Sequence, residues 1–561
     1  MSARGLRGVV LLCVVVYGLG LGDVPFYTRG EPREGLVVRE MLRTGAWLVP
    51  QRPEGEVARK PPLYYWLAAP LVQVLPDAPE LALRLPSAAL ATGGVALTWV
   101  AGRAMAGPAA ALPAALVLAT SFEWTRAATS ARIDMTLAAG LTGLLVAWLV
   151  VLAGGSRRWL VAAGVGATMA TLAKGPVGLV VPALAAGAFA AWRRDRTVIR
   201  RLGVVPVLGG AALVAALWYL AAFAEQGRAF FDVVVKENLV RFIDTDDAKT
   251  GHAHGFFYLA IVGLVGLLPW VPLVPFATPK RRDDEATSFA AVWTVVVLVF
   301  FSVANAKRSV YLLPAFPALA LCIGVGIASG ERPWARRLAA AYAPCLALLG
   351  ALGIALAAGL DPAVALRRWL RPDDAHGASA VAAAASGRAM LVAVLGLVTI
   401  AAGVMVERAR RRSDWTWVVL GVAVAMAGWT VVFDTTIHPA IARTRSLQAF
   451  MATVDRMLPE DVTLAASFPT DPGLRFYAPR PLVRLELQGG DTARHLLVWE
   501  DEWRRLRDAR GEPLAVLAVS DARQARQGAM ALVVAPAGTL RRVAPAASPP
   551  SEPGLHAAPV R

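Results

Sequence analysis

Charge is scarce in this sequence of 561 residues. Only 17% of the residues are Asp, Glu, Lys or Arg, whereas 57% are hydrophobic and the mean hydropathy is +0.53. A water-soluble globular protein of this length does not need so apolar a composition. The shortage of charge therefore excludes an ordinary soluble enzyme and favours a protein embedded in a membrane.

Cysteine is rare as well. The three cysteines, Cys13, Cys322 and Cys345, each lie inside an apolar block, which is typical of helix-packed thiols and not of a disulfide framework or a metal site. The chain also shows no repeat of fixed period, and no small-residue cleavage site stands out after its first apolar block. We therefore expect that block to be a membrane anchor and not a removed signal peptide.

The apolar residues gather into blocks whose length suits a membrane-spanning helix, which needs about 20 residues. This pattern predicts a polytopic α-helical membrane protein with about thirteen transmembrane helices. The blocks are 8–22, 82–102, 108–122, 133–153, 159–173, 176–192, 203–223, 256–277, 287–303, 309–328, 337–359, 389–406 and 416–434.

A net charge of +17 is compatible with a nucleic-acid partner, but the distribution of the charge excludes that partner. Much of it lies in short basic segments between apolar blocks, and such loops are retained in the cytoplasm. With the N-terminus inside, alternation of thirteen helices places every one of these segments in the cytoplasm. The segments are Arg157–Arg158, Arg193–Arg201, Lys280–Arg282, Arg332–Arg337 and Arg408–Arg412.

The same topology leaves a long first loop, residues 23–81, on the outer side, together with everything after residue 433. We expect a transmembrane domain over 1–435 and a small soluble α/β domain over 436–544, with a disordered tail, rich in Pro, Ala and Ser, over 545–561. Short strand-like runs predict the sheet, and a helical pattern surrounds Trp499–Arg507. The runs are Asp461–Phe468, Pro481–Leu487, Leu514–Val519 and Ala531–Val534.

The first outer loop carries unusual charge for an outer segment. Residues 30–45 predict an amphipathic interfacial helix, and Glu31 stands at its start, where a carboxylate is favoured by the helix dipole. Lys60 precedes Pro61 and the aromatic run Tyr64–Trp66, a place where a lipid phosphate could be held at the membrane interface. A helix-start role for Glu31 and snorkelling of Lys60 between aromatic anchors are the structural alternatives.

Asp134 lies at the outer end of the fourth apolar block. A carboxylate embedded in such a segment is costly and usually faces a cavity or a partner. Arg132 is the obvious local partner, so a structural ion pair is the alternative to a functional role.

Several of these motifs together resemble one family, the GT-C glycosyltransferases that include aminoarabinose lipid A transferases and dolichyl-phosphate-mannose protein mannosyltransferases. The resemblance covers about residues 8–330. The motifs are Gly30-Glu31-Pro32-Arg33-Glu34, Lys60-Pro61-Pro62-Leu63-Tyr64-Tyr65-Trp66, Arg84-Leu85-Pro86-Ser87, Ile133-Asp134, Ala173-Lys174-Gly175-Pro176, Trp218-Tyr219, Asn238 with Arg241-Phe242, and Lys307 with Tyr311-Leu312-Leu313-Pro314.

The resemblance implies an enzyme that transfers a sugar from a polyprenyl-phosphate donor to a lipid A-like or other cell-envelope acceptor, with inversion, on the periplasmic side of a bacterial inner membrane. Glu31 and Asp134 would be the catalytic carboxylates, since one must serve the acceptor and the other support developing charge. The donor phosphate would be bound by cations, for which Lys60 is the first candidate and Lys174, Arg241 and Lys307 are the others. The expected partners are the lipid-linked donor, a lipid or protein acceptor and membrane lipids.

Departures from the family pattern concern the acidic group and the metal. Relatives usually carry Asp where this chain has Gly30, so the acidic role passes to Glu31. Relatives often carry Glu at the position of Arg59, where it can help to hold a metal. His252 and His254 lie near a histidine of those relatives, but two histidines at this spacing are more often polar loop residues. We therefore predict no metal site and no cofactor.

Three other functions remain open on the sequence. A non-catalytic assembly factor would keep the fold without the acids, and Gly30 in place of the family's Asp leaves it open. A protein O-mannosyltransferase differs mainly in its acceptor. A transporter or flippase of lipid-linked sugars predicts charges at mid-membrane in two related halves, whereas the charges here gather at the outer ends of the blocks.

Overall fold

The coordinates are those of a computed structural model, in which the N-terminal four fifths of the chain is almost continuous. The described residues are 2–235, 254–277, 284–304, 307–330, 332–365, 368–369, 372–462, 464–466, 471–478, 480, 482–484, 495–500, 504, 515–524 and 528–534. Arg241 and His252 lie outside them.

The chain divides into two compact units. The first comprises Met1–Val24, Glu34–Arg367 and Ala378–Pro439, and the second comprises Pro25–Arg33, Arg368–Gly377 and Ala440–Arg561. The domain bounds expected from the sequence, 1–435, 436–544 and 545–561, stay a prediction.

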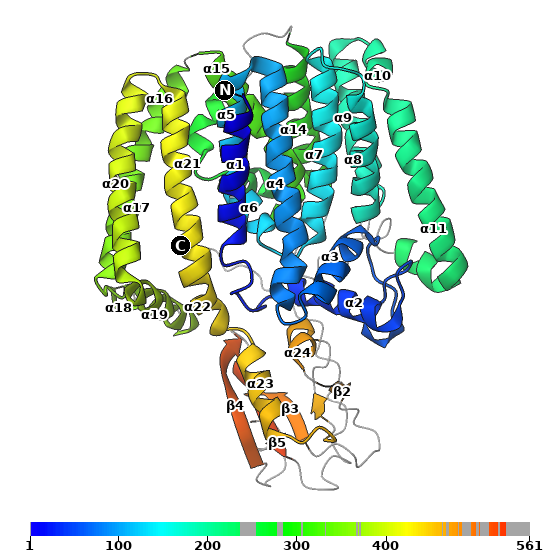
Figure 1. Cartoon of the computed structure of the whole chain (residues 1–561), viewed down its shortest axis with the longest axis vertical. Helices are drawn as coiled ribbons and strands as arrows, with labels where there is room; N and C mark the ends of the chain where they lie inside the picture. The colour runs from blue at the N-terminus through cyan, green and yellow to red at the C-terminus, as the bar shows by residue number, and fades with distance from the viewer. Residues whose placement is uncertain are drawn as a thin grey trace. The chain divides into compact units, whose positions relative to one another are not determined.

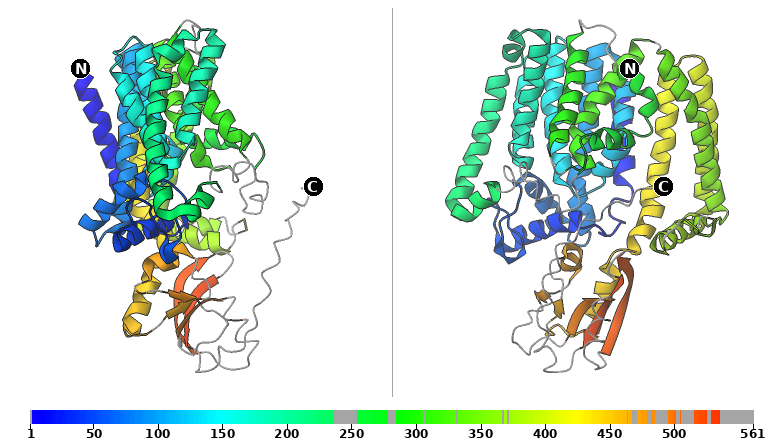
Figure 2. Two further views of the ribbon diagram at one scale, coloured as in Figure 1. Left: turned by 90° about the vertical axis from the view of Figure 1, so that its right-hand side faces the viewer. Right: turned by 180° about the vertical axis from the view of Figure 1, so that it is seen from behind.

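Long helices form the first unit, and most of them stand side by side in a bundle (Figures 1 and 2). Its N-terminal half contains α1 (Ser2–Gly18), α2 (Gly30–Thr44), η1 (Pro53–Gly55), α3 (Leu63–Val74), α4 (Pro79–Ala106), α5 (Pro108–Ala119), α6 (Phe122–Ala128), α7 (Ile133–Leu152), α8 (Trp159–Lys174), α9 (Val177–Arg193), α10 (Thr197–Arg201) and α11 (Val204–Val235). The rest contains α13 (Tyr258–Gly266), η4 (Val271–Ala277), α14 (Glu285–Val303), η5 (Ser309–Ala315), α15 (Phe316–Ala328), α16 (Pro333–Leu338), η6 (Ala339–Ala341), α17 (Tyr342–Ala357), α18 (Pro362–Ala365), α19 (Pro372–Gly387), α20 (Ala389–Arg411), α21 (Trp415–Val432), η7 (Phe433–Ile437) and α22 (His438–Arg443). Three of these elements, α2, α19 and α22, run across the boundary between the units.

The prediction of a polytopic helical membrane protein is confirmed at this level. Within the described residues, eight helices are long and apolar enough to cross a membrane, or nine if the bent pair of α13 and η4 is one span. Each of the thirteen apolar blocks falls on one or more helical segments. Thirteen crossings would require the shorter helices α1, α5, α8 and α9 to span as well, so that number stays a proposal.

Helix α7 lies inside the bundle, where most of its residues are buried. It packs along α8 at a very short distance, and glycines make this possible. A methyl group on Gly140 would lie 2.6 Å from the backbone nitrogen of Ala170, and one on Gly166 would lie 2.5 Å from that of Leu144. Both distances are too short for a side chain, so the two backbones approach as closely as only glycine allows.

The first outer loop contains the amphipathic helix that was predicted over 30–45, which is α2. It also contains a short apolar helix, α3, which the sequence analysis does not predict. Arg84 fastens the start of the loop, because its buried guanidinium donates from Nη1 to the carbonyl oxygens of Leu21 (2.9 Å) and Val24 (2.7 Å).

The second unit contains a five-stranded mixed sheet in the order β2-β1-β3-β5-β4. Strands β1 (Leu464–Ala466), β2 (Leu482–Arg484) and β3 (His495–Trp499) are parallel, whereas β4 (Ala515–Gln524) and β5 (Gly528–Val534) form an antiparallel pair beside β3. Helices α23 (Gln448–Met457) and α24 (Pro472–Tyr477) pack with it around a core that includes Trp499.

The α/β character of this unit agrees with the sequence, with one correction. The helical pattern was placed from Trp499, but Trp499 ends strand β3, which the sequence reading missed. The run His495–Trp499 contains three aliphatic residues flanked by His and Trp, and so short an apolar run does not distinguish a strand from the start of a helix. Most of 500–507 lies outside the described residues.

Candidate functional site

An ion pair between two helices forms the centre of the candidate site. Asp134 lies in the first turn of α7 and Lys174 is the last residue of α8, and the lysine Nζ is 2.5 Å from the carboxylate Oδ1. Both side chains are mostly buried, with 21% and 17% exposure. A charge-assisted hydrogen bond of this kind fixes the position of the carboxylate.

This pairing corrects one expectation, since the local partner expected for Asp134 was Arg132. The phosphate-binding role expected for Lys174 stays a prediction. Because the glycines Gly140 and Gly166 bring α7 and α8 together, the C-terminal end of α8 meets the N-terminal end of α7, and the lysine reaches the carboxylate from the neighbouring helix.

Further cations lie near the pair. Arg132 and Lys60 lie within electrostatic range of Asp134, and Arg308 lies within that range of Lys174. The Nε of Arg132 is buried and has no hydrogen-bond partner among the described residues. A buried guanidinium nitrogen without a partner is costly, so this position is suited to an anion or a water molecule.

Tyr311 in η5 completes the group. The Nζ of Lys174 lies 4.5 Å from the centre of the Tyr311 ring, within the range of a cation–π interaction. The sequence predicts no role for Arg308, and it indicates Tyr311 only as part of a motif. The signal that could have identified them is their position just after Lys307 in that same motif.

Lys307 itself is occupied elsewhere. Its side chain is buried, and Nζ donates a hydrogen bond of 2.8 Å to the carbonyl oxygen of His254. The ring of His254 in turn stacks on Tyr258 at 3.8 Å. Lys307 therefore ties the segment before α13 to the start of η5, which supports the neighbouring Arg308 and Tyr311.

A second ion pair, between Arg126 and Glu123, contacts the start of η5. Arg126 of α6 forms a two-point interaction with the buried carboxylate of Glu123, with Nη2–Oε1 at 2.5 Å and Nε–Oε2 at 3.0 Å. The same Nη2 donates to Oγ of Ser309 at 3.2 Å. The backbone that leads to Tyr311 is thus held by contacts at Lys307 and Ser309.

The aromatic run after Lys60 is internal and not interfacial at its first two positions, which corrects the sequence reading. Tyr64 and Tyr65 are 0% and 2% exposed, and their hydroxyls donate to the Leu83 carbonyl (2.8 Å) and to the Glu34 carboxylate (2.7 Å). Trp66 donates from Nε1 to the Trp47 carbonyl at 2.7 Å. These bonds anchor the chain directly after Lys60.

Glu31, the other candidate carboxylate, is described with the second unit, whereas Lys60, Asp134, Lys174 and Lys307 belong to the first. It lies in the first turn of α2, as expected, and is 6% exposed. Its neighbour Arg29 lies 3.6 Å from the carboxylate of Asp471 within the same unit. Its catalytic role stays a proposal.

Metal ligands do not gather in the part of the chain that the structure describes, where no three His, Cys, Asp or Glu side chains could hold a metal ion together.

Comparison with known proteins identifies the fold. The family model of the dolichyl-phosphate-mannose-protein mannosyltransferases matches residues 59–226. Among solved structures, ArnT from Cupriavidus metallidurans bound to undecaprenyl phosphate has a TM-score of 0.76 at 21% identity, with 97% of this chain and 100% of that chain covered. The chain has the GT-C fold. The resemblance drawn from the motifs is thereby confirmed.

Curated relatives resemble this chain in sequence as well. The undecaprenyl phosphate-alpha-4-amino-4-deoxy-L-arabinose arabinosyl transferase of Aeromonas salmonicida is 29% identical over 382 residues, which is 66% of this chain and 68% of that protein. The enzyme of the same name from Pectobacterium atrosepticum is 28% identical over 361 residues, 62% of this chain and 64% of the relative. The aligned part thus spans about two thirds of each relative.

Proposed function

We propose that this GT-C protein transfers a sugar from a polyprenyl-phosphate donor to a lipid A-like acceptor, with inversion, on the periplasmic face of a bacterial inner membrane. The observation that carries the proposal is the cationic group around the Asp134–Lys174 pair, where the ends of α7 and α8, η5 and the first outer loop supply charges to one place. The relatives named for undecaprenyl-phosphate aminoarabinose transfer support this donor class.

The charges suit a departing lipid phosphate. Lys174, Arg132 and Lys60 lie within electrostatic range of Asp134 in the described part of this site, and Arg308 lies within that range of Lys174. In the reaction the bond between the anomeric carbon and the phosphate oxygen breaks, and negative charge grows on that oxygen. Preorganised cations stabilise this charge more in the transition state than in the ground state, which is the requirement for catalysis.

Lys60 and Arg132 are the proposed phosphate ligands, and Lys174 is a positioning residue. Because the Lys174 ammonium is already paired with Asp134, its main effect is to hold the carboxylate. Asp134 and Glu31 are the proposed catalytic carboxylates. One accepts the proton of the acceptor hydroxyl as its oxygen attacks the anomeric carbon, and the other supports the positive charge that develops on the sugar.

Turnover by the purified full chain tests the proposal. Undecaprenyl-phosphate aminoarabinose with lipid A should give aminoarabinosylated lipid A and free undecaprenyl phosphate, identified by mass spectrometry and by the anomeric configuration of the product. The match to the mannosyltransferase family model favours a second acceptor class, so polyprenyl-phosphate mannose with a Ser/Thr-rich peptide is the parallel reaction. Transfer only to the peptide would show that the acceptor is a protein and not lipid A. No transfer in either reaction would refute the proposed glycosyltransferase activity.

A further inference from the structure

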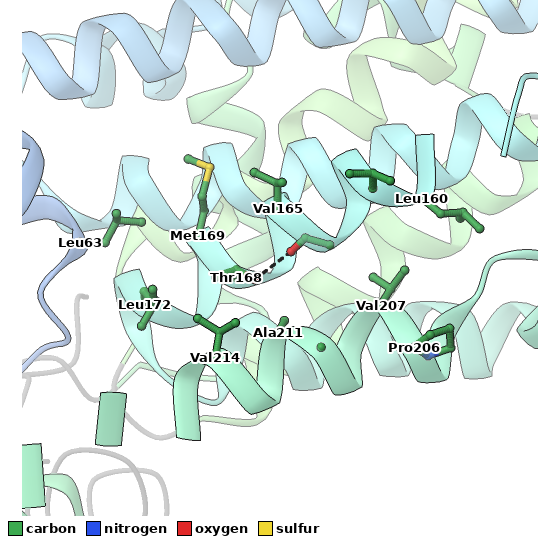
Figure 3. Close-up of a pocket in the computed structure, with 13 residues that line it drawn as sticks. Leu63, Leu160, Val165, Thr168, Met169, Leu172, Pro206, Val207, Ala211 and Val214 are labelled. Carbon is green, nitrogen blue, oxygen red and sulfur yellow. Dashed lines mark hydrogen bonds between the residues drawn. The ribbon is translucent and has the colours of Figure 1, made fainter. Parts of the chain in front are cut away.

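An apolar groove of about 690 Å³ lies between α8 and α11 in the first unit (Figure 3). Along α8 its lining runs from Leu160 to Leu172, and along α11 from Pro206 to Val214. Thr168 is its one hydroxyl-bearing residue, and that hydroxyl donates to the carbonyl oxygen of Gly164 at 2.9 Å. The groove therefore offers hydrocarbon contact and no free polar group.

The outer end of the groove is closed by hydrocarbon. Leu172 packs there with Val49, Val57 and Trp218 in one hydrophobic cluster. Lys174, two residues further along α8, is directed to Asp134 of α7 and not to α11. Leu63 of α3, three residues after Lys60, also lines the groove, so competition by undecaprenyl phosphate is part of the test.

The inner end is flanked by basic segments. Arg157 and Arg158 directly precede α8, and Arg200 lies in α10 just before α11. The two segments meet, since a methyl group on Gly203 would lie 3.3 Å from Cδ1 of Leu160. All three arginines are exposed and form no ion pair among the described residues.

The acidic groups of this region are already satisfied. Asp195 accepts hydrogen bonds from the hydroxyl and the amide of Thr197 (2.6 and 2.8 Å), which hold the pKa of its carboxyl below its usual value. Glu285 of α14 pairs with Arg201 at 2.8 Å. The neighbouring carboxylates therefore have their own partners, and the exposed arginines keep their charge for an external anion.

We propose that this groove binds an anionic phospholipid of the cytoplasmic leaflet, with one acyl chain between α8 and α11 and the headgroup phosphate on Arg157, Arg158 and Arg200. The twelve-residue distance from Leu160 to Leu172 corresponds to about 18 Å of helix. That length is close to one leaflet, about half of a 30 Å hydrocarbon core. The inference depends on the cytoplasmic location of the arginines and not on the transferase activity.

Lipid photo-crosslinking to the full chain in nanodiscs tests the site. Phosphatidylglycerol and phosphatidylcholine, each with a diazirine on an acyl chain, would be compared for labelling of residues 160–172 and 206–214. Each arginine near a membrane surface contributes about 1 kcal/mol to the binding of anionic lipid, or about fivefold in affinity. We expect phosphatidylglycerol to label these segments at least tenfold more strongly.

Two sets of variants separate the headgroup from the groove. Replacing Arg157, Arg158 and Arg200 with Gln should remove the preference for phosphatidylglycerol, whereas Arg408→Gln with Arg412→Gln, also exposed arginines, should not. Gly164→Leu with Gly210→Leu should fill the groove and reduce labelling by both lipids, since a side chain at either glycine meets open space. Gly209→Leu, beside the groove on α11, is the matched control.

Three outcomes would overturn the proposal. Equal labelling by the two lipids in the unchanged protein would show only annular lipid without headgroup recognition. An unchanged preference for phosphatidylglycerol after the three arginine substitutions would show that the headgroup binds elsewhere. Displacement of the phospholipid by undecaprenyl phosphate that requires Lys60 would assign the groove to the donor chain. If the double glycine variant fails to fold, the arginine set still decides.

Discussion

At the scale of single residues, the charged side chains around Asp134 differ in whether they already have a hydrogen-bond partner. The lysine holds the carboxylate from the neighbouring helix, and Arg132 leaves a buried Nε without a partner among the described residues. Residues that differ in this way should respond differently to substitution.

Asp134→Asn should remove most turnover while the protein stays folded, because the amide keeps the shape of the side chain and loses its charge. It also leaves Lys174 partly buried without a counter-charge, at a cost of about 1–3 kcal/mol. The double variant Asp134→Asn with Lys174→Met should recover much of that stability and none of the activity. Recovery of activity in the double variant would show that the pair is only structural.

Glu31→Gln should also reduce turnover, with donor binding largely intact, because its proposed role is in the chemical step. Kinetics with saturating donor measure this effect, and Glu40→Gln is the control, since Glu40 of the same helix forms a local pair with Arg43 at 2.6 Å. Near-normal turnover of the Glu31 variant would reduce Glu31 to a helix-start residue and leave Asp134 with the catalytic role.

Lys60→Ala should weaken binding of undecaprenyl phosphate about tenfold or more, since a hydrogen bond to a charged group contributes about 1.5–3 kcal/mol. Arg43→Ala and Arg52→Ala are matched controls, because these arginines pair with Glu40 (2.6 Å) and Glu56 (3.1 Å) in the same loop. Binding would be measured by calorimetry at low and high salt. Equal losses in all three variants would indicate diffuse attraction to lipid, which salt screens, and would refute a specific site.

At the scale of elements, the close approach of α7 and α8 decides the geometry of the site. Gly166→Ala places a methyl group 2.5 Å from the Leu144 nitrogen, so the helices must separate and the Lys174–Asp134 contact must lengthen. We expect a loss of about 1–3 kcal/mol in stability together with reduced turnover. Gly164→Ala, on the same helix with open space around it, is the control, and equal thermal stability of the two variants would contradict the packing argument.

At the scale of the whole molecule, the topology determines which charges face which side. With thirteen crossings the arginine-rich loops lie inside and the candidate site lies outside. In a cysteine-free background, an impermeant thiol reagent added to intact spheroplasts should label a cysteine at Glu460 and leave one at Ser156 unlabelled. Both positions are exposed. Labelling of Ser156→Cys from outside would show the opposite orientation, and it would also refute the proposed cytoplasmic lipid site.

The sequence by itself determined the membrane environment, the positions of the long apolar helices and the resemblance to GT-C glycosyltransferases, because each rests on properties that are local along the chain. A block of about 20 apolar residues forms a helix wherever it inserts. Motifs such as Lys60-Pro61-Pro62 and Ile133-Asp134 can be identified without knowing what they touch. The amphipathic helix α2 was likewise visible in the periodicity of residues 30–45.

Tertiary structure alone decided the partners of those residues. Asp134 pairs with Lys174 and not with Arg132, because glycines on α7 and α8 allow two backbones to meet that are separate in the sequence. Tyr64 and Tyr65 are internal hydrogen-bond donors for the same kind of reason, since their acceptors lie 19 and 31 residues away. Side-chain partners depend on distances between helices, and neither composition nor periodicity contains those distances.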